Sequence, residues 1–211
     1  QIEDNTAVLM AGGLDGDKLL RRTEGIIGRE IRGKGPGGPD ACRFLGSLTC
    51  KGPVWRFDTA AALCPKVYQL QDSFGFAAPM LEQIRAAARG RGYRAVICPD
   101  PEHIDRIQHL LLPDLGLAFV TSREGMVYDG PAYRRVRLDA MMPGSYYKQH
   151  KSRLKFVRRV VEVLRAEGLE ALREAKAAHD ALEAVYNPYV DFDGVRAQAA
   201  LEAGRLLSYL K

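Results

Sequence analysis

An apolar run, a short polar loop and an amphipathic segment follow one another in residues 67–84, VYQLQDSFGFAAPMLEQI. The run Val67–Leu70 is typical of a buried strand, and Met80, Leu81 and Ile84 recur at the spacing of a helix face. A strand that leads through a short loop into a helix places backbone N–H groups at the helix N-terminus, where proteins bind phosphate. This unit predicts an α/β fold with an anion-binding frame.

The loop of this unit lacks most of the chemistry that a triphosphate requires. A working phosphate-binding loop, GxxxxGK(S/T), supplies glycines that curl around phosphate, a lysine for the β and γ oxygens, and a Ser or Thr for Mg²⁺. Gly75 is the one glycine at a required position, whereas Ala78 and Pro79 occupy the lysine and Ser/Thr positions. Asp72 would also repel a phosphate at ~4 Å by about 4 kcal/mol in an effective dielectric of ~20.

We therefore interpret the segment as a vestigial phosphate loop without catalytic residues. Two readings stay open: a residual anion site at the N-terminus of the helix that begins at Ala77, or an ordinary turn in which phenylalanine fills the space of a nucleotide. The bulky phenylalanines favour the second reading. The residues of the vestigial loop are Gln71, Asp72, Ser73, Phe74, Gly75, Phe76, Ala77, Ala78 and Pro79.

Strand and helix patterns alternate along the middle of the chain, which predicts a parallel α/β sheet covered by helices. Besides the central strand, we expect strands at Arg43–Leu48, Arg94–Cys98 and Leu117–Ser122, and an edge strand or hairpin arm at Tyr133–Leu138. Helices are expected at Leu14–Ile31 (capped by Asp15), Val54–Leu63, Ala77–Gly90 and Glu102–His109, with a turn at Lys51–Pro53. A long helix follows from Ser145 to Pro188, and a last one, opened by Asp193, covers Gly194–Leu210.

The Gly- and Pro-rich segment Arg32–Asp40 is the clearest linker. It divides residues 1–31, read as the helical tail of a preceding repeat, from an α/β core over residues 41–144. Residues 145–211 are expected to form a helical hairpin that packs on this core. The triplets Leu14–Gly16 and Phe192–Gly194 are weakly alike, which suggests a tandem repeat, and we expect the chain to be a piece of a longer one.

Composition places few limits on function. The net charge of +5 permits anionic partners without requiring them. The four cysteines, Cys42, Cys50, Cys64 and Cys98, form no CxxC pair and have no histidine at a metal-ligand spacing, which predicts reduced thiols in the cytoplasm and no metal site. No apolar run approaches the length of a membrane span, so no membrane association is expected.

The order of several segments resembles a family of poorly characterised P-loop ATPase-like proteins from spore-forming Gram-positive bacteria. The segments are RFLGSLTCKGPV, VYQLQDSFGFAAPMLEQI, GYRAVICPD, HLLLPDLGLAFVTS and AKAAHDALEAVYNPYVDFDGV. Members of this family consist of two tandem P-loop-like halves, of which the leading one usually has an intact loop and the trailing one often a decayed loop. The resemblance covers about Arg43–Lys211 and implies a P-loop NTPase-like fold with a C-terminal long-helix hairpin.

Carried over by position, Asp72 replaces the first loop glycine, Ala78 the lysine and Pro79 the Ser/Thr. The strand Leu117–Ser122 would be the Walker B strand, with Thr121 and Ser122 where an acid should hold Mg²⁺. The resemblance implies a trailing half that needs no cofactor, whereas ATP and Mg²⁺ would bind elsewhere in the full-length protein. Its expected partner is the upstream half of the same protein, or another copy of the chain.

Other candidate sites have plainer interpretations that we favour. The stripe Lys148, Lys151, Lys155, Arg158 and Arg159 could bind nucleic acid. We favour a solvated helix face, with Leu154, Val157 and Val161 turned inward. Asp100, Glu102 and Asp105 could hold a metal or act as a base, but capping by Asp100 of a helix explains the cluster. His179 falls on an apolar helix stripe, which predicts a core or interface histidine.

The sequence therefore favours a non-catalytic P-loop-like domain with a structural or regulatory role beside an active half. Two alternatives remain. One is a nucleotide-binding ATPase or nucleotide-kinase-like enzyme with a non-standard loop, in which Arg89, Arg91 or Lys66 replaces the missing lysine. The other is a nucleic-acid-binding module that uses the basic helix face.

Overall fold

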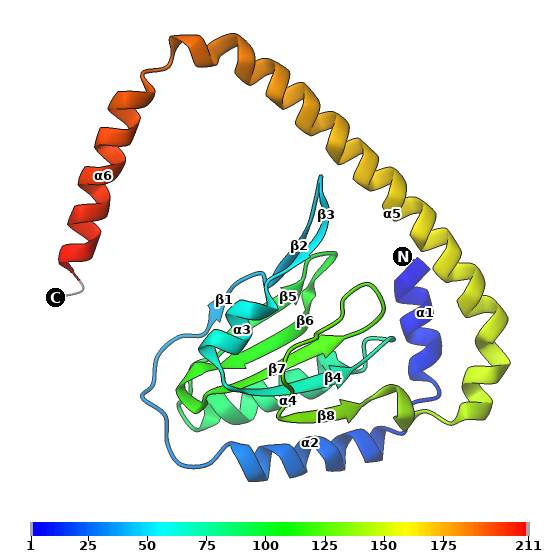
Figure 1. Cartoon of the computed structure of the whole chain (residues 1–211). Helices are drawn as coiled ribbons and strands as arrows, with labels where there is room; N and C mark the ends of the chain where they lie inside the picture. Colours follow the sequence, from blue (N-terminus) through cyan, green and yellow to red (C-terminus); the bar gives the residue numbers. More distant parts are fainter. Residues whose placement is uncertain (1, 210–211) are drawn as a thin grey trace.

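The computed structural model describes residues 2–209 and has a six-stranded sheet at its centre (Figure 1). The strand order is β1-β5-β6-β7-β4-β8. Strand β6 is antiparallel to both of its neighbours, and the other three pairings are parallel. The expected α/β class, with a mostly parallel sheet flanked by helices, is confirmed. The strands are β1 (Ala41–Cys42), β4 (Lys66–Gln71), β5 (Val96–Asp100), β6 (His103–Leu112), β7 (Leu117–Ser122) and β8 (Arg134–Arg137).

Helices and a small hairpin cover the two faces of the sheet. On one face, α1 (Ile2–Ala11), α2 (Gly16–Glu30) and α4 (Ala77–Gly90) share a buried apolar cluster with alternate residues of the strands. On the other face, a second cluster forms beneath α3 (Phe57–Leu63) and beside the hairpin of β2 (Gly46–Thr49) and β3 (Gly52–Trp55). The sheet therefore has apolar residues on both faces, as its near-continuous hydrophobic strands predict.

The central strand–loop–helix unit lies where its pattern predicts it, although the strand is one residue longer at each end than Val67–Leu70. The strand is β4, the helix α4 begins at Ala77, and Leu117–Ser122 is β7, which pairs with β4 in parallel register. Met80, Leu81 and Ile84 are fully buried on the inner face of α4. Because β4 and β7 are neighbours, Gln71 and Ser122 lie side by side at the carboxyl edge of the sheet.

Residues 2–31 pack into the core, whereas residues 32–40 form an irregular connection. Met10, Leu19, Ile26 and Ile31 belong to the same apolar cluster as β4 and α4, so the described part of the N-terminal segment is built into the core. Asp15 caps α2 as expected, since its side chain accepts the N–H of Lys18. Residues 32–40 are irregular, as their glycines and prolines predict.

The prediction of a helix at Glu102–His109 is wrong, because β6 occupies this segment. Ile104, Ile107 and Leu110 repeat at helical spacing, but the chain reverses at Pro101–Glu102 and residues 107–112 pair with neighbouring strands. Pairing on both sides thus overrides a local pattern.

Smaller boundary predictions also differ from the structure. Of the strand expected at Arg43–Leu48, only the part from Gly46 onward is extended, in β2, and β1 lies before the expected segment. The helix expected from Val54 begins only at Phe57. The turn expected at Lys51–Pro53 is shorter, because Gly52 and Pro53 already pair within the hairpin. Of the two readings of Tyr133–Leu138, the edge strand is confirmed, and β8 pairs with β4 in parallel.

The C-terminal third consists of two helices that leave the sheet. Helix α5 (Gly144–Tyr186) packs on α1 and touches β2, and the short 3-10 turn η3 (Asn187–Tyr189) separates it from α6 (Phe192–Ser208). Leu154 is the one buried residue of α5, and α6 has none over its described length. In Figure 1, α5 runs away from the domain and α6 turns back at an angle to it. Asp191, not Asp193, caps α6, because its carboxylate accepts the N–H of Gly194.

Candidate functional site

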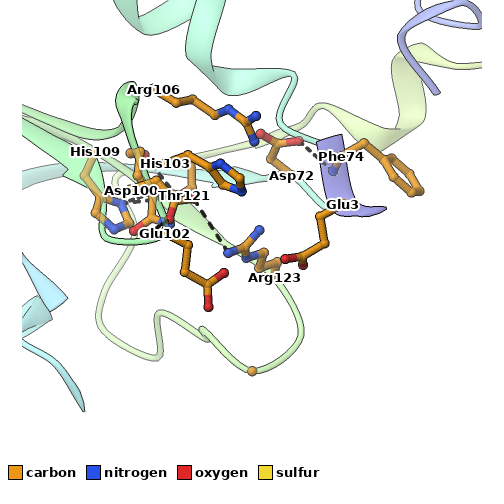
Figure 2. Close-up of polar contacts among 12 residues, drawn as sticks. Glu3, Asp72, Phe74, Asp100, Glu102, His103, Arg106, His109, Thr121 and Arg123 are labelled. Atoms are coloured by element: carbon orange, nitrogen blue, oxygen red, sulfur yellow. Dashed lines mark hydrogen bonds and ion pairs between the residues drawn. The ribbon is translucent and has the colours of Figure 1, made fainter. Parts of the chain in front are cut away.

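The loop between β4 and α4 closes around a carboxylate of the chain itself. Asp72 is 5% exposed, and its Oδ1 accepts the backbone N–H groups of Phe74 at 3.1 Å and Phe76 at 2.9 Å. Its Oδ2 accepts the N–H of Ala77 at 2.7 Å (Figure 2 shows Asp72 beside Phe74). These amides belong to the loop and to the first turn of α4, whose positive dipole end favours an anion. The carboxylate thus occupies the position of an anion that such a loop would bind.

The backbone conformation of Gly75 and the hydrogen bonds of Ser73 also fix the shape of this loop. Gly75 has φ +83°, a left-handed conformation that a side chain would strain. Ser73 donates its N–H and its hydroxyl to the two oxygens of Asp139, at 2.9 and 2.8 Å. Asp139 begins the short turn η2 (Asp139–Met141). Burial and the charge of Asp72 raise the pKa of Asp139 against the two Ser73 bonds.

The phenylalanines and the remaining loop positions differ in burial. Phe76 is buried in the main apolar cluster, and Phe74 packs against it with the ring centroids 5.6 Å apart. Phe74 also lines a cavity beside the loop. Ala78 is partly buried and Pro79 is exposed. The two phenylalanines therefore pack on each other and on the core beside the loop.

The side chains at the end of β7 take part in structural hydrogen bonds. Thr121 donates its hydroxyl to the carbonyl of Gln108 at 3.0 Å, and its N–H to Nδ1 of His109 at 3.1 Å. The Ser122 hydroxyl oxygen accepts from the Gln69 amide at 3.3 Å and from the N–H of Tyr128 at 3.1 Å. Both hydroxyls are therefore engaged in holding neighbouring segments.

His109 is a neutral core residue. Its side chain is 1% exposed, and burial, helped by the charge of Arg123, lowers its pKa to about 3. Trp55 and Phe57 stand edge-on to its ring. Its Nδ1 accepts a hydrogen bond, so the proton of the neutral ring is assigned to Nε2.

A cavity of about 280 Å³ lies at the carboxyl edge of the sheet, between the loop, α1 and α5. This volume is close to the lower limit of small-molecule sites. Figure 2 shows charged side chains of both signs converging there. The acidic and basic residues of its lining are Glu3, Asp100, Glu102, Arg106, Arg123, Glu124, Arg158, Glu162 and Arg165, and His103 lies among them.

Two arginines of this cavity stand nearest to the loop and the strand ends. Arg106 Nη1 lies 3.6 Å from the position that a Cβ on Gly75 would take, and Nη2 donates to Asp4 at 3.0 Å. The Arg123 guanidinium lies 3.9 Å from Asp100. The three cations expected to replace the missing lysine do not lie here. Lys66 begins β4, and Arg89 and Arg91 lie at the C-terminal end of α4, about 20 Å along the helix from the loop.

The acidic cluster after β5 is explained by a turn and an ion pair. Asp100 Oδ1 accepts the N–H of Glu102 at 3.0 Å, so it caps a strand-to-strand turn and not the expected helix. Glu102 pairs with Arg165 at 2.8 Å, and Asp105 is exposed. Among residues 2–209, no three His, Cys, Asp or Glu side chains gather in a metal-ligand arrangement.

The basic stripe of α5 is a mainly solvated face. Lys148, Lys151, Lys155 and Arg159 are exposed, whereas Arg158 pairs with Glu124 at 3.0 Å at the cavity rim. Leu154 is buried, and Val157 and Val161 line the cavity, as expected. Of the two readings of His179, the core reading is wrong, because its side chain is 55% exposed and pairs with Glu183. The interface reading stays a prediction.

Sequence reasoning missed three site residues. Arg123 follows the predicted strand directly, so its place at the carboxyl edge could have been inferred. Arg106 was assigned to a helix, and Asp139 had no local signal that linked it to Ser73.

The four cysteines are unpaired, and no helix within the described residues is both long and apolar enough to cross a bilayer.

Comparison of the chain with protein-family models, curated proteins and solved structures found no match.

Proposed function

We propose that this chain is a non-catalytic P-loop-like domain whose anion-binding loop is filled by its own Asp72 carboxylate. The observation that carries the proposal is the set of three loop amides donated to that carboxylate. In a working loop the corresponding amides face phosphate. Here they are satisfied before any ligand arrives.

The energetics of the loop support an inert role. Hydrogen bonds to a charged acceptor contribute about 1.5–3 kcal/mol each, and a phosphate that displaced Asp72 would lose them. Phosphoryl transfer depends almost entirely on positioned cations and Mg²⁺. The lysine position holds Ala78, and the end of β7 holds two engaged hydroxyls in place of an acid.

The role that we propose is structural or regulatory, through docking on an ATP-hydrolysing half or a second copy. The exposed apolar stripe of α5 supports a docking role, because solvated apolar rows of this length are typical of interaction surfaces. The stripe consists of Leu164, Leu172, Leu182, Val185 and Tyr186. ATP and Mg²⁺ would be bound by the partner half, and the location that suits these reduced thiols is the cytoplasm.

Calorimetric titration with Mg·ATP tests this function. We expect no saturable heat at micromolar nucleotide for the wild-type chain, because the loop amides are already occupied. Asp72→Gly removes the carboxylate, and Asp105→Gly removes an exposed one as a matched control. Micromolar binding by the wild-type chain would overturn the proposal.

A second candidate is a nucleotide-binding enzyme with a non-standard loop. The observation that favours it is the pair Arg106 and Arg123, which stand beside the loop and β7. The Gln108 side chain adds a buried oxygen with no partner among the described residues, and it lines a small cavity of about 30 Å³ beside Asp72. This candidate predicts Mg·ATP binding that Arg106→Ala abolishes and Arg89→Ala does not.

A further inference from the structure

A second hollow, unrelated to the loop, runs along the free edge of the sheet. It lies between β8, the last strand in the sheet order, and α2, and encloses about 550 Å³. Figure 1 shows α2 beside β8 at the bottom of the domain. The lining contains six cationic side chains and, within the described residues, no acidic one. The cations are Lys18, Arg21, Arg22, Arg29, Arg135 and Arg137; we call this the α2–β8 groove.

The cations form an ordered row and not a random cluster. On α2, Lys18, Arg21 or Arg22, Gly25 and Arg29 follow one another at steps of three and four, so they share one helix face. This face runs for about 16 Å along the helix axis. Arg135 and Arg137 alternate along β8 and supply the opposite wall.

Half of these side chains have no intramolecular partner. Arg29 donates to the Tyr68 hydroxyl and pairs with the Glu30 carboxylate, both at 3.0 Å. Arg135 donates to Gln69 at 2.9 Å, and Lys18 to a backbone carbonyl at 3.5 Å. Arg21, Arg22 and Arg137 make no hydrogen bond or ion pair with any described residue. Like charges that line one groove repel one another, so a bound polyanion would relieve the repulsion among Arg21, Arg22 and Arg137, which no described carboxylate neutralises.

An aromatic side chain stands near one end of the row. Tyr133, 45% exposed, lies edge-on to Tyr68, the residue that holds Arg29. The cations of Lys66 and Arg134 lie over its ring, at 5.7 and 5.2 Å from the centroid. Tyr133 does not line the groove itself, and the two cations over its ring extend the positive charge beyond the end of the row. A groove of cations that follows the phosphate backbone is the electrostatic part of single-stranded nucleic-acid sites.

We propose that the α2–β8 groove binds single-stranded nucleic acid through its phosphate backbone, with little sequence preference. Five of its six cations are arginines, whose planar fork suits phosphate oxygens. The groove is hollow, and its lining offers no exposed large apolar side chain to a bilayer, so an anionic membrane fits it less well. This binding is independent of the proposed function at the β4–α4 loop.

Fluorescence anisotropy with a labelled oligothymidylate of ~12 nucleotides, within the range of known single-strand sites, tests the proposal. We compare the wild-type chain with the triple variant Arg21→Ala, Arg22→Ala, Arg137→Ala. Removal of three phosphate contacts should make the negative slope of log affinity against log salt shallower by about 2. It should also weaken binding at least tenfold at ~50 mM salt. The matched control is Lys148→Ala, Lys151→Ala, Lys155→Ala on the α5 face, which should bind within about twofold of the wild-type chain.

Three results would overturn the proposal. They are no salt-dependent binding by the wild-type chain, an equal loss in the α5 control, and binding to phosphatidylserine vesicles without binding to the oligonucleotide. The three arginines are exposed and unpaired, so the variant should keep the wild-type unfolding midpoint. If the triple variant does not fold, Arg137→Gln alone replaces it. This variant should make the salt slope shallower by about 0.7, the value for one phosphate on a single strand. An unchanged slope would contradict nucleic-acid binding in the α2–β8 groove.

Discussion

Asp72 shows how one side chain can replace a ligand. A free helix N-terminus leaves several N–H groups without partners, and a loop that curls around phosphate leaves more. The Asp72 carboxylate satisfies three of them at 2.7–3.1 Å from within the chain. The loop therefore keeps its curled shape with no ligand, and a side chain that was expected only to repel phosphate also stabilises the turn.

Asp72→Asn should destabilise the fold by about 2–3 kcal/mol. The amide group of asparagine would face either the N–H of Ala77 or those of Phe74 and Phe76, and two donors would then meet. Urea denaturation measures the change. The control is the exposed residue Asp105, where Asp105→Asn should cost less than about 0.5 kcal/mol; an Asp72 variant as stable as that control would contradict the role of the carboxylate.

His109 predicts a pH dependence of stability. Its pKa in the fold is lowered from 6.5 to about 3, so between these values the unfolded chain binds a proton that the folded chain does not. The contribution of neutral His109 to the free energy of unfolding is therefore fully present above pH 6.5. As the pH falls from 6.5 toward 3, the free energy of unfolding decreases by about 1.4 kcal/mol per pH unit. His109→Gln retains an acceptor but does not titrate, and should reduce this slope by about that amount in urea melts at several pH values. His179→Gln, at an exposed site, should leave the slope unchanged; equal slopes in all three chains would exclude His109 as the cause.

At the scale of elements, local pattern predicted what local contacts determine. The positions of β4, α4 and β7 follow from apolar runs and helical spacing, and the structure retains them. The failures lie where distant pairing decides. Residues 107–112 join β6 because strands on both sides bind them, and the inward helix stripe of α5 ends near Val161, since no described segment covers the helix beyond the cavity and the β2 contact.

Deletion of residues 187–211 should leave the thermal unfolding midpoint within about 2 °C of the wild-type value, because α6 buries no residue in its described length. Differential scanning calorimetry gives the midpoint. A fall of more than about 5 °C would mean that α6 packs on the domain in solution, as a hairpin closing on the core requires.

At the scale of the whole molecule, the fold assembles two charged hollows from residues that are remote in sequence. The cavity joins α1, the β4–α4 loop, β5, β6, the segment after β7 and α5. The α2–β8 groove joins residues 18–29 to residues 135–141. Neither could be predicted from the sequence, because each depends on which strand lies at the sheet edge and which helix lies beside it. The three arginines of β8 were visible as a run, but only the strand order brings two of them beside α2.

The central claim is that the loop amides already hold an anion, and their NMR signals test it directly. The backbone amides of Phe74, Phe76 and Ala77 are followed while Mg·ATP is added to the ¹⁵N-labelled chain. The account predicts that these three signals do not move up to millimolar nucleotide, even if signals of the cavity or the α2–β8 groove shift. Saturable shifts of all three at micromolar nucleotide would contradict it, because they would show the amides exchanging Asp72 for phosphate.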